Sequence, residues 1–208
     1  MDTIDAILFD LGGVFINIDY QATIEAFKKL GFNNAEQLYS QSEQALLFEK
    51  YEIGDISTPH FINNLLTISN SNISPNQVVK AWNSMIGDFS IKSIAVLKNL
   101  QKKYKLFMLS NTNDLHTELV KRKWQEVENT PFDSYFEKIH FSHQLGMRKP
   151  YPETFLKVCD INFINPKKTL FIDDSIQHIE GAEKAGLQTI HLKKIADLSS
   201  VLNAYGIN

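Results

Sequence analysis

The chain has 208 residues, of which 43% are hydrophobic and 22% are charged, and its formal net charge is −3. These values are typical of a globular protein and give no reason to expect nucleic acid or an anionic membrane as a partner. The single cysteine, Cys159, excludes an intramolecular disulfide framework and a cysteine-based zinc site. No apolar run approaches the length of a membrane span, and the acidic start differs from a secretory signal, so we expect a cytoplasmic protein.

The first predicted strand, Ile7–Phe9, ends in an unusual way. Asp10 follows the three apolar residues, and after Leu11 come two glycines, Gly12 and Gly13. An unbroken apolar run is typical of a central strand in a parallel sheet, and ligands bind at the carboxyl ends of such strands. The glycines allow the backbone to turn sharply and to approach a bound group closely. For this stretch alone, a strand-ending turn with an incidental aspartate is an alternative interpretation.

The next stretch, residues 19–85, has a helical pattern throughout. Asp19 is a candidate N-cap for the first helix, and Gly31 is placed to end it. A second helix is expected over about residues 34–49. Two more helices are predicted where a capping residue precedes a proline at the first helical position, at Thr58-Pro59 and Ser74-Pro75.

Strands and helices alternate in the remainder of the chain. Apolar strands are predicted at residues 105–109, 139–141, 169–172 and 188–192, with helices between them. This alternation indicates a parallel sheet covered by helices on both faces. The predicted fold class is therefore α/β, with a Rossmann-like core of residues 1–17 and 88–208. A helical domain of residues 18–87 is inserted after the first strand, and we expect its two short links, near residues 17–19 and 87–90, to act as hinges.

Polar residues gather where the core strands end: Asp10, Ser110-Asn111, Lys149 and Asp173-Asp174. A carboxylate at Asp10 can attack phosphorus, and Lys149 can offset the charge that grows in the transition state. The Ser110 hydroxyl and the backbone N–H groups of the following turn can hold phosphoryl oxygens. The adjacent carboxylates predict a hard cation such as Mg²⁺, because without a metal they would repel the substrate and one another.

These clusters, in this order, resemble the four motifs of the haloacid dehalogenase (HAD) superfamily. The matching stretches are Phe9–Val14, Leu109–Thr112, Lys149-Pro150 and Ile172–Asp174. The resemblance implies the HAD fold, with residues 18–87 in the place of an α-helical C1-type cap. The residues around His116 and before Lys149 look most like the bacterial glucose-1-phosphatase-like branch.

Carried over by position, the resemblance implies a role for each site residue. Asp10 would be the nucleophile, and Lys149 would balance the charge around it. Phosphate and substrate contacts would come from Ser110, Asn111 and His116. A Mg²⁺ ion would be held by Asp10, Asp173, Asp174 and the backbone carbonyl of Gly12. A packing histidine is an equally strong interpretation of His116, and no role is assigned to the other histidines.

Gly12 departs from the pattern of the family's phosphatases, which usually carry a second aspartate two residues after the nucleophile. That carboxylate acts as general acid for the leaving group and as base for the attacking water. Such a group is typically worth about 10²–10⁴-fold in rate. The departure leaves formation of the aspartyl phosphate possible but predicts slow turnover of poor leaving groups.

Three functions remain open at this point. The first is a Mg²⁺-dependent phosphatase of small phosphorylated metabolites such as sugar phosphates. The second is a hydrolytic dehalogenase, a branch that also lacks the second aspartate but has less use for the Asp173-Asp174 pair. The third is a member that binds a phosphometabolite without turnover, for which Gly12 is the only argument. The sequence makes no prediction of oligomeric state.

Overall fold

A computed structural model describes residues 3–32, 35, 42–69 and 72–207. Its centre is a parallel sheet of five strands in the order β5-β4-β1-β6-β7. The strands are β1 (Ala6–Phe9), β4 (Lys105–Ser110), β5 (Lys138–Phe141), β6 (Thr169–Asp173) and β7 (Gln188–His191). The α/β fold class and the parallel sheet predicted from the sequence are confirmed.

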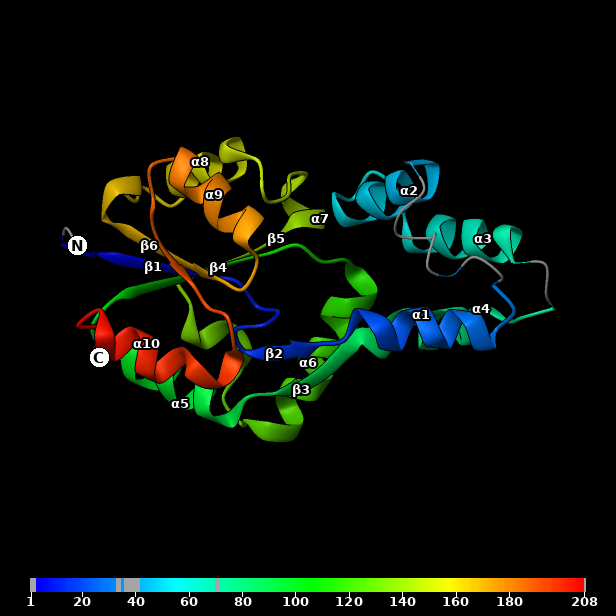
Figure 1. Ribbon diagram of the computed structural model, residues 1–208, viewed down its shortest axis with the longest axis horizontal. Helices are drawn as coiled ribbons and strands as arrows, with labels where there is room; N and C mark the ends of the chain where they lie inside the picture. The colour runs from blue at the N-terminus through cyan, green and yellow to red at the C-terminus, as the bar shows by residue number, and fades with distance from the viewer. Residues whose placement is uncertain (1–2, 33–34, 36–41, 70–71, 208) are drawn as a thin grey trace.

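Helices cover both faces of the sheet (Figure 1). Side chains alternate along β1, so Leu8 packs on one face while Ile7 and Phe9 pack on the other. The face of Leu8 is covered by α8 (Pro152–Ile161) and α9 (Ile176–Lys184), and Cys159 is buried there, as expected. The opposite face is covered by α5 (Ile91–Leu100), α6 (Asp114–Val127) and α10 (Leu198–Ala204).

The strand order reverses at β1, and this reversal places the site. The chain moves outward from β1 through β4 to β5, then returns to the other side of β1 for β6 and β7. Ligands of such sheets bind outside the carboxyl ends of the strands at the point of reversal. Asp10, Ser110 and Asp173 lie at the carboxyl ends of the three central strands.

In the described part of the chain, four α-helices follow the first strand before the chain returns to the sheet. We call this part of the chain the helical insertion; it comprises α1 (Tyr20–Lys29), α2 (Ser42–Glu52), α3 (Thr58–Ile68) and α4 (Pro75–Trp82). It extends to one side of the sheet (Figure 1). None of the helices in the described part of the chain is long and apolar enough to cross a membrane.

The helix ends test the capping predictions. Asp19 caps α1 as expected, and Gly31, with φ 88°, follows the end of that helix. Ser74 caps α4 in a capping box with Gln77. The cap of α3 is Ser57, one residue before the predicted Thr58, because a serine oxygen is equally able to accept the exposed N–H groups. The predicted start of the second helix, near residue 34, lies outside the described residues.

A short antiparallel ribbon, absent from the sequence prediction, joins the helical insertion to the core. Its strands are β2 (Ile16–Ile18) and β3 (Ile86–Phe89), with Ile16 opposite Phe89 and Ile18 opposite Ile86. The Asn17 side chain also donates a hydrogen bond to the backbone oxygen of Asp88, at 3.1 Å. The two links predicted as separate short connections are therefore paired with each other, although they lie far apart in the sequence.

Candidate active site

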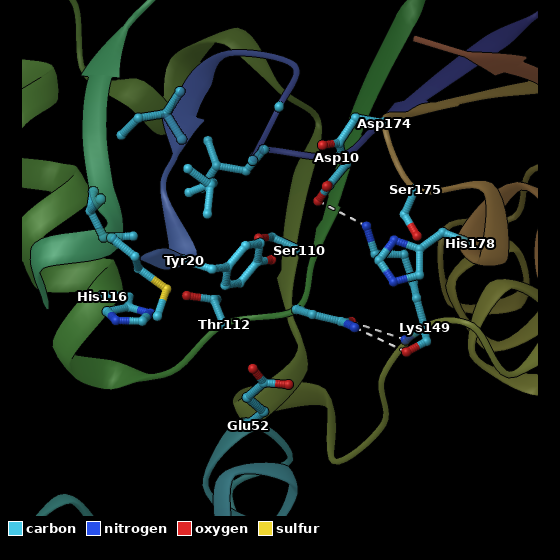
Figure 2. A pocket seen from close by; sticks show the side chains of 18 of the residues that line it. Asp10, Tyr20, Glu52, Ser110, Thr112, His116, Lys149, Asp174, Ser175 and His178 are labelled. Carbon is cyan, nitrogen blue, oxygen red and sulfur yellow. Dashed lines mark hydrogen bonds and ion pairs between the residues drawn. The ribbon is translucent and has the colours of Figure 1, made fainter. Parts of the chain in front are cut away.

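A cavity of about 650 Å³ lies between the carboxyl edge of the sheet and the helical insertion (Figure 2). From the core it is lined by the predicted site residues Asp10, Gly12, Ser110, Asn111, His116, Lys149 and Asp174. From the helical insertion it is lined by Tyr20, Phe48, Glu49, Glu52 and Trp82. The sheet edge that the sequence indicated is thus the wall of a cavity large enough for a small metabolite.

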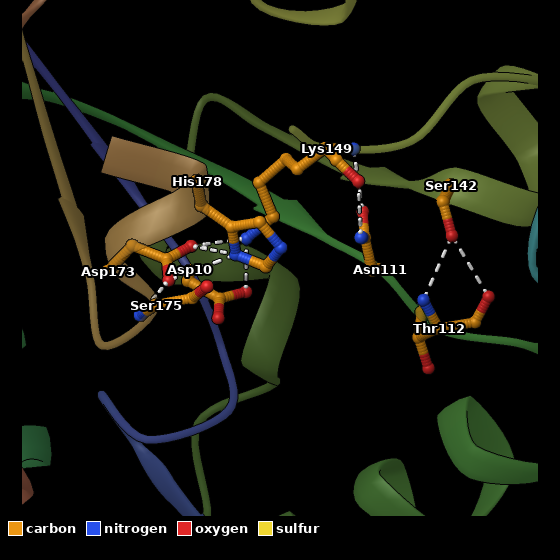
Figure 3. Close-up of polar contacts among 8 residues, drawn as sticks. All are labelled: Asp10, Asn111, Thr112, Ser142, Lys149, Asp173, Ser175 and His178. Atoms are coloured by element: carbon orange, nitrogen blue, oxygen red, sulfur yellow. Dashed lines mark hydrogen bonds and ion pairs between the residues drawn. The ribbon is translucent and has the colours of Figure 1, made fainter. Parts of the chain in front are cut away.

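Lys149 lies at the centre of the polar site. Its Nζ atom is 2.8 Å from Asp10 Oδ1 and 2.6 Å from Asp173 Oδ2, and its side chain is fully buried (Figure 3). A buried ammonium group is tolerated only when it is paired, and two carboxylates pair it here. Burial alone would lower the pKa of Lys149, but the two carboxylates hold it above its ordinary value. Lys149 is therefore a permanent positive charge beside Asp10.

Asp173 is held by the protein on both of its oxygens. Besides Lys149, it accepts a hydrogen bond from the backbone N–H of Ser175 at 2.7 Å, and His178 Nδ1 lies 2.9 Å from its Oδ2. Burial would raise the pKa of Asp173, but Lys149 and His178 hold it below its ordinary value. The sequence assigned no role to His178. Its position in the first turns of α9 brings it back to the end of β6, and no spacing rule predicted that contact.

Asp174 lies against the glycine turn that follows β1. Gly13 has φ +67°, and a Cβ atom there would lie 2.2 Å from Asp174 Oδ2. Only glycine leaves room for the Asp174 carboxylate at this place. The close approach to the backbone that the sequence predicted at the two glycines is thus made, at Gly13, by the Asp174 side chain. Gly12 has a backbone conformation open to other residues, but a Cβ atom there would lie 2.9 Å from Ile18 Cγ1.

The acidic side chains fit a divalent cation. Burial raises the pKa of Asp10 against the opposing effect of Lys149, and burial with the nearby Asp173 raises the pKa of Asp174. One lysine therefore does not stabilise all the negative charge that these carboxylates can carry. Carboxylate oxygens are the ligands that Mg²⁺ prefers. His178 also lies beside this cluster, but its Nδ1 atom is already paired with Asp173.

The residues at the end of β4 and just after it lie where the sequence predicted, but some of their polar groups have other partners. Ser110 is buried and lines the cavity. The Asn111 amide both donates to the backbone oxygen of Lys149 and accepts from its N–H, each at 2.9 Å (Figure 3). The Thr112 N–H donates to Ser142 Oγ at 2.9 Å. The Asn111 side chain thus positions Lys149, and the Thr112 N–H, expected among the phosphate donors, is already in use.

His116 also lines the cavity, but it is a packed, neutral histidine. Its ring stacks on Trp82, with the ring centroids 4.9 Å apart. Its Nε2 lies 3.2 Å from the backbone oxygen of Trp82, and its Nδ1 lies 3.1 Å from the Asn113 amide nitrogen. Burial lowers the pKa of His116 to about 4, so the ring carries no charge near neutral pH. Both ring nitrogens have protein partners in this structure.

Known proteins share this architecture over nearly the whole chain. A D-ribitol-5-phosphate phosphatase of Bacteroides thetaiotaomicron is 29% identical over 202 residues, which is 95% of this chain and 98% of the relative. The crystal structure of a HAD family enzyme of the same organism, complexed with magnesium and inorganic phosphate, is 36% identical with a TM-score of 0.83, over 90% of this chain and 93% of that one. A predicted HAD-like hydrolase of Porphyromonas gingivalis is 30% identical with a TM-score of 0.82, over 90% of both chains. The family model for haloacid dehalogenase-like hydrolases matches residues 7–192, and the chain belongs to this family.

Proposed function

We propose that the protein is a Mg²⁺-dependent phosphatase that hydrolyses phosphate monoesters of small metabolites, such as sugar phosphates. The observation that carries the proposal is the buried Asp10–Lys149 ion pair, which opens onto a cavity shared with Asp174 and Ser110. The names of the relatives agree with it, since one is a sugar-alcohol phosphatase and another binds magnesium with phosphate. The negative charge that Lys149 alone does not offset favours a metal-dependent phosphatase over a dehalogenase.

The proposed reaction has two steps. Lys149 pairs with Oδ1 of Asp10, so we assign the attack on phosphorus to Oδ2. In this first step the bond from phosphorus to the ester oxygen breaks, and the alcohol leaves with a proton taken from water. Water then hydrolyses the aspartyl phosphate, which releases inorganic phosphate and restores Asp10. Ser110 would donate a hydrogen bond to a phosphoryl oxygen, and Lys149 would stabilise the charge that develops around Asp10.

The metal ligands would be Asp10, Asp174 and the backbone carbonyl of Gly12. When bound, Mg²⁺ would act as a Lewis acid that neutralises charge on the phosphoryl oxygens. Asp173 would not bind the metal directly, because its oxygens are held by Lys149, His178 and the Ser175 N–H. Its proposed role is to position Lys149 and, at most, to reach the metal through water.

Residues 18–87 would form the cap domain of this enzyme, with the core made of residues 1–17 and 88–208. The helical insertion reaches the core through an ion pair between Arg148 Nη2 and Glu52 Oε2, at 3.2 Å. A second contact between the helical insertion and the core is a hydrogen bond from Thr58 to Asp114, at 3.5 Å. A cap in this position would exclude water from the site and restrict substrates to small esters, so folded phosphoproteins should be poor substrates.

The test of the metal assignment is Asp174→Asn. We expect the variant to bind Mg²⁺ at least about tenfold more weakly, because an amide lacks the charge of a ligand carboxylate. Titration calorimetry measures the affinity, and phosphate release with and without a chelator measures its consequence. Asp160→Asn, on an exposed position of α8, is the matched control. Equal Mg²⁺ affinity in Asp174→Asn and the wild type would remove Asp174 from the site.

Gly12 leads to a prediction about leaving groups. With no carboxylate at position 12 to protonate the leaving oxygen, kcat/KM of the wild type should fall steeply as the pKa of the leaving alcohol rises. The measurement is kcat/KM over a series of aryl and alkyl phosphates. A flat dependence, with phosphoryl transfer rate-limiting, would mean that another group donates the proton.

The structure also shows how to restore the missing acid. Gly12→Asp alone would press its Cβ on Ile18, so the useful variant is Gly12→Asp combined with Ile18→Ala. We expect it to accelerate alkyl phosphates by about 10²-fold or more and aryl phosphates much less. Ile18→Ala alone is the control for the added space, and Mg²⁺ affinity is measured in each variant first. An equal gain for both substrate classes would argue against proton donation at position 12.

A further inference from the structure

The wall of the cavity that the helical insertion forms has a distinct chemistry. Among the described lining residues of this segment are two carboxylates, Glu49 and Glu52, and the phenol of Tyr20, but no lysine, arginine or histidine. Figure 2 draws Glu52 across the pocket from Asp10 and Asp174. If the phosphoryl group lies at Asp10, the alcohol part of the substrate extends toward this wall.

Glu52 forms an ion pair with the core at that wall. It is the last residue of α2, and its Oε2 lies 3.2 Å from Nη2 of Arg148, the residue before Lys149. Oε2 of Glu52 and Nε of Arg148 are both buried, and neither makes a hydrogen bond. The contact between Glu52 and Arg148 is thus one of charge. The Glu52 side chain keeps 23% of its surface exposed, and it lines the cavity.

An oriented carboxylate selects its ligand by charge and by hydrogen bonding. It accepts hydrogen bonds from hydroxyl groups, and a hydrogen bond to a charged group is stronger than one between neutral groups. It repels a second anionic group, and Arg148, the cation that it contacts, is already paired with it. A neutral leaving group rich in hydroxyls satisfies both conditions.

We infer that Glu52, held by Arg148, determines which phosphate esters are accepted, and this inference rests on the proposed phosphatase function. Glu52 accepts hydrogen bonds from the hydroxyls of a sugar or sugar alcohol, and it rejects esters whose far end carries a carboxylate or a second phosphate. The substrate class is thus the monophosphate ester of a neutral polyhydroxylated compound. Arg148 is a positioning residue, because it acts through Glu52.

Two esters of the same chain length test this inference. Glucitol 6-phosphate and 6-phosphogluconate differ at the far end of the chain, where one has a hydroxymethyl group and the other a carboxylate. We expect the wild type to prefer the first, by the ratio of kcat/KM values, and Glu52→Gln to reduce that preference by about tenfold. The amide removes the repulsion and leaves Arg148 able to pair with the carboxylate of the substrate. Glu52→Asp keeps the charge and should retain most of the preference.

Glu25→Gln is the matched control, since Glu25 is an exposed residue of α1 that pairs with Lys28 and is not among the described residues lining the cavity. Its preference should equal that of the wild type. The same two esters are also titrated by calorimetry into the Asp10→Asn background, with and without Glu52→Gln, so that the ratio of Kd values is obtained without turnover. A wild type that hydrolyses neither ester contradicts the proposed function, while the Kd ratio still decides the role of Glu52. A preference that is the same with Glu52 and with Gln at position 52, in both assays, would overturn the inference.

Discussion

Asp10→Asn is expected to abolish phosphate release, with a fall in kcat of at least roughly 10⁴-fold, because an amide cannot form the acyl phosphate. The fold should survive, since Lys149 keeps its ion pair with Asp173 at 2.6 Å. The measurements are steady-state phosphate release and, for the wild type, mass spectrometry of enzyme quenched in acid during turnover of an aryl phosphate. The wild type should carry one added phosphoryl group on the peptide that contains Asp10.

Asp5→Asn is the matched control for this variant. Asp5 precedes β1 at the opposite end of the strand, where its carboxylate is exposed and pairs with Lys168. The control should keep wild-type activity, because it changes the same functional group outside the site. Phosphatase activity retained by pure, folded Asp10→Asn protein would exclude the covalent mechanism.

Lys149→Met should reduce both stability and activity. Methionine fills similar space but leaves Asp10 and Asp173 as buried carboxylates without their shared cation. Removing one partner of a buried ion pair typically costs about 3–5 kcal/mol, so the free energy of unfolding should fall by that amount. Urea denaturation measures the loss, and a parallel series with Mg²⁺ shows how much of it the metal restores.

The control for this variant is Lys168→Met, which removes an exposed lysine paired with Asp5 at 3.2 Å. Exposed ion pairs contribute little, so its effect on unfolding should lie within about 1 kcal/mol. Equal losses in the free energy of unfolding for the two substitutions would contradict the stabilising role of the ion pairs that Lys149 forms with Asp10 and Asp173.

The elements that carry the chemistry were predictable because their signals are local. A central parallel strand such as β1 is apolar on both faces, and the polar residue that ends it stands out against that background. Asp10, Ser110 and Asp173 were found in this way, and the rule that strands of one parallel sheet align their carboxyl ends then brought them together. The helical insertion was recognised from its capping residues and its 3.6-residue period.

The remaining features depend on contacts between distant parts of the chain. The two strands of the ribbon are three and four residues long, and each is completed only by the other, so neither has a pattern of its own. The motif predicts a phosphate contact for Asn111, but it does not reveal that the amide binds the Lys149 backbone, 38 residues further along. Similarly, the identity of His178 does not reveal that its ring meets Asp173. Such partners are set by tertiary packing rather than by local preference.

The ribbon of β2 and β3 also restricts how the site can open. Both crossings between the helical insertion and the core belong to one hydrogen-bonded unit, so neither can shift along its length without breaking the register with the other. Bending and twisting of the ribbon are its remaining soft motions. Asn17, Ile18 and Ile86 of the ribbon line the cavity, so the same deformation that admits a substrate or releases phosphate reshapes the wall that contacts it. Any opening that bends the ribbon would therefore also change the shape of the cavity.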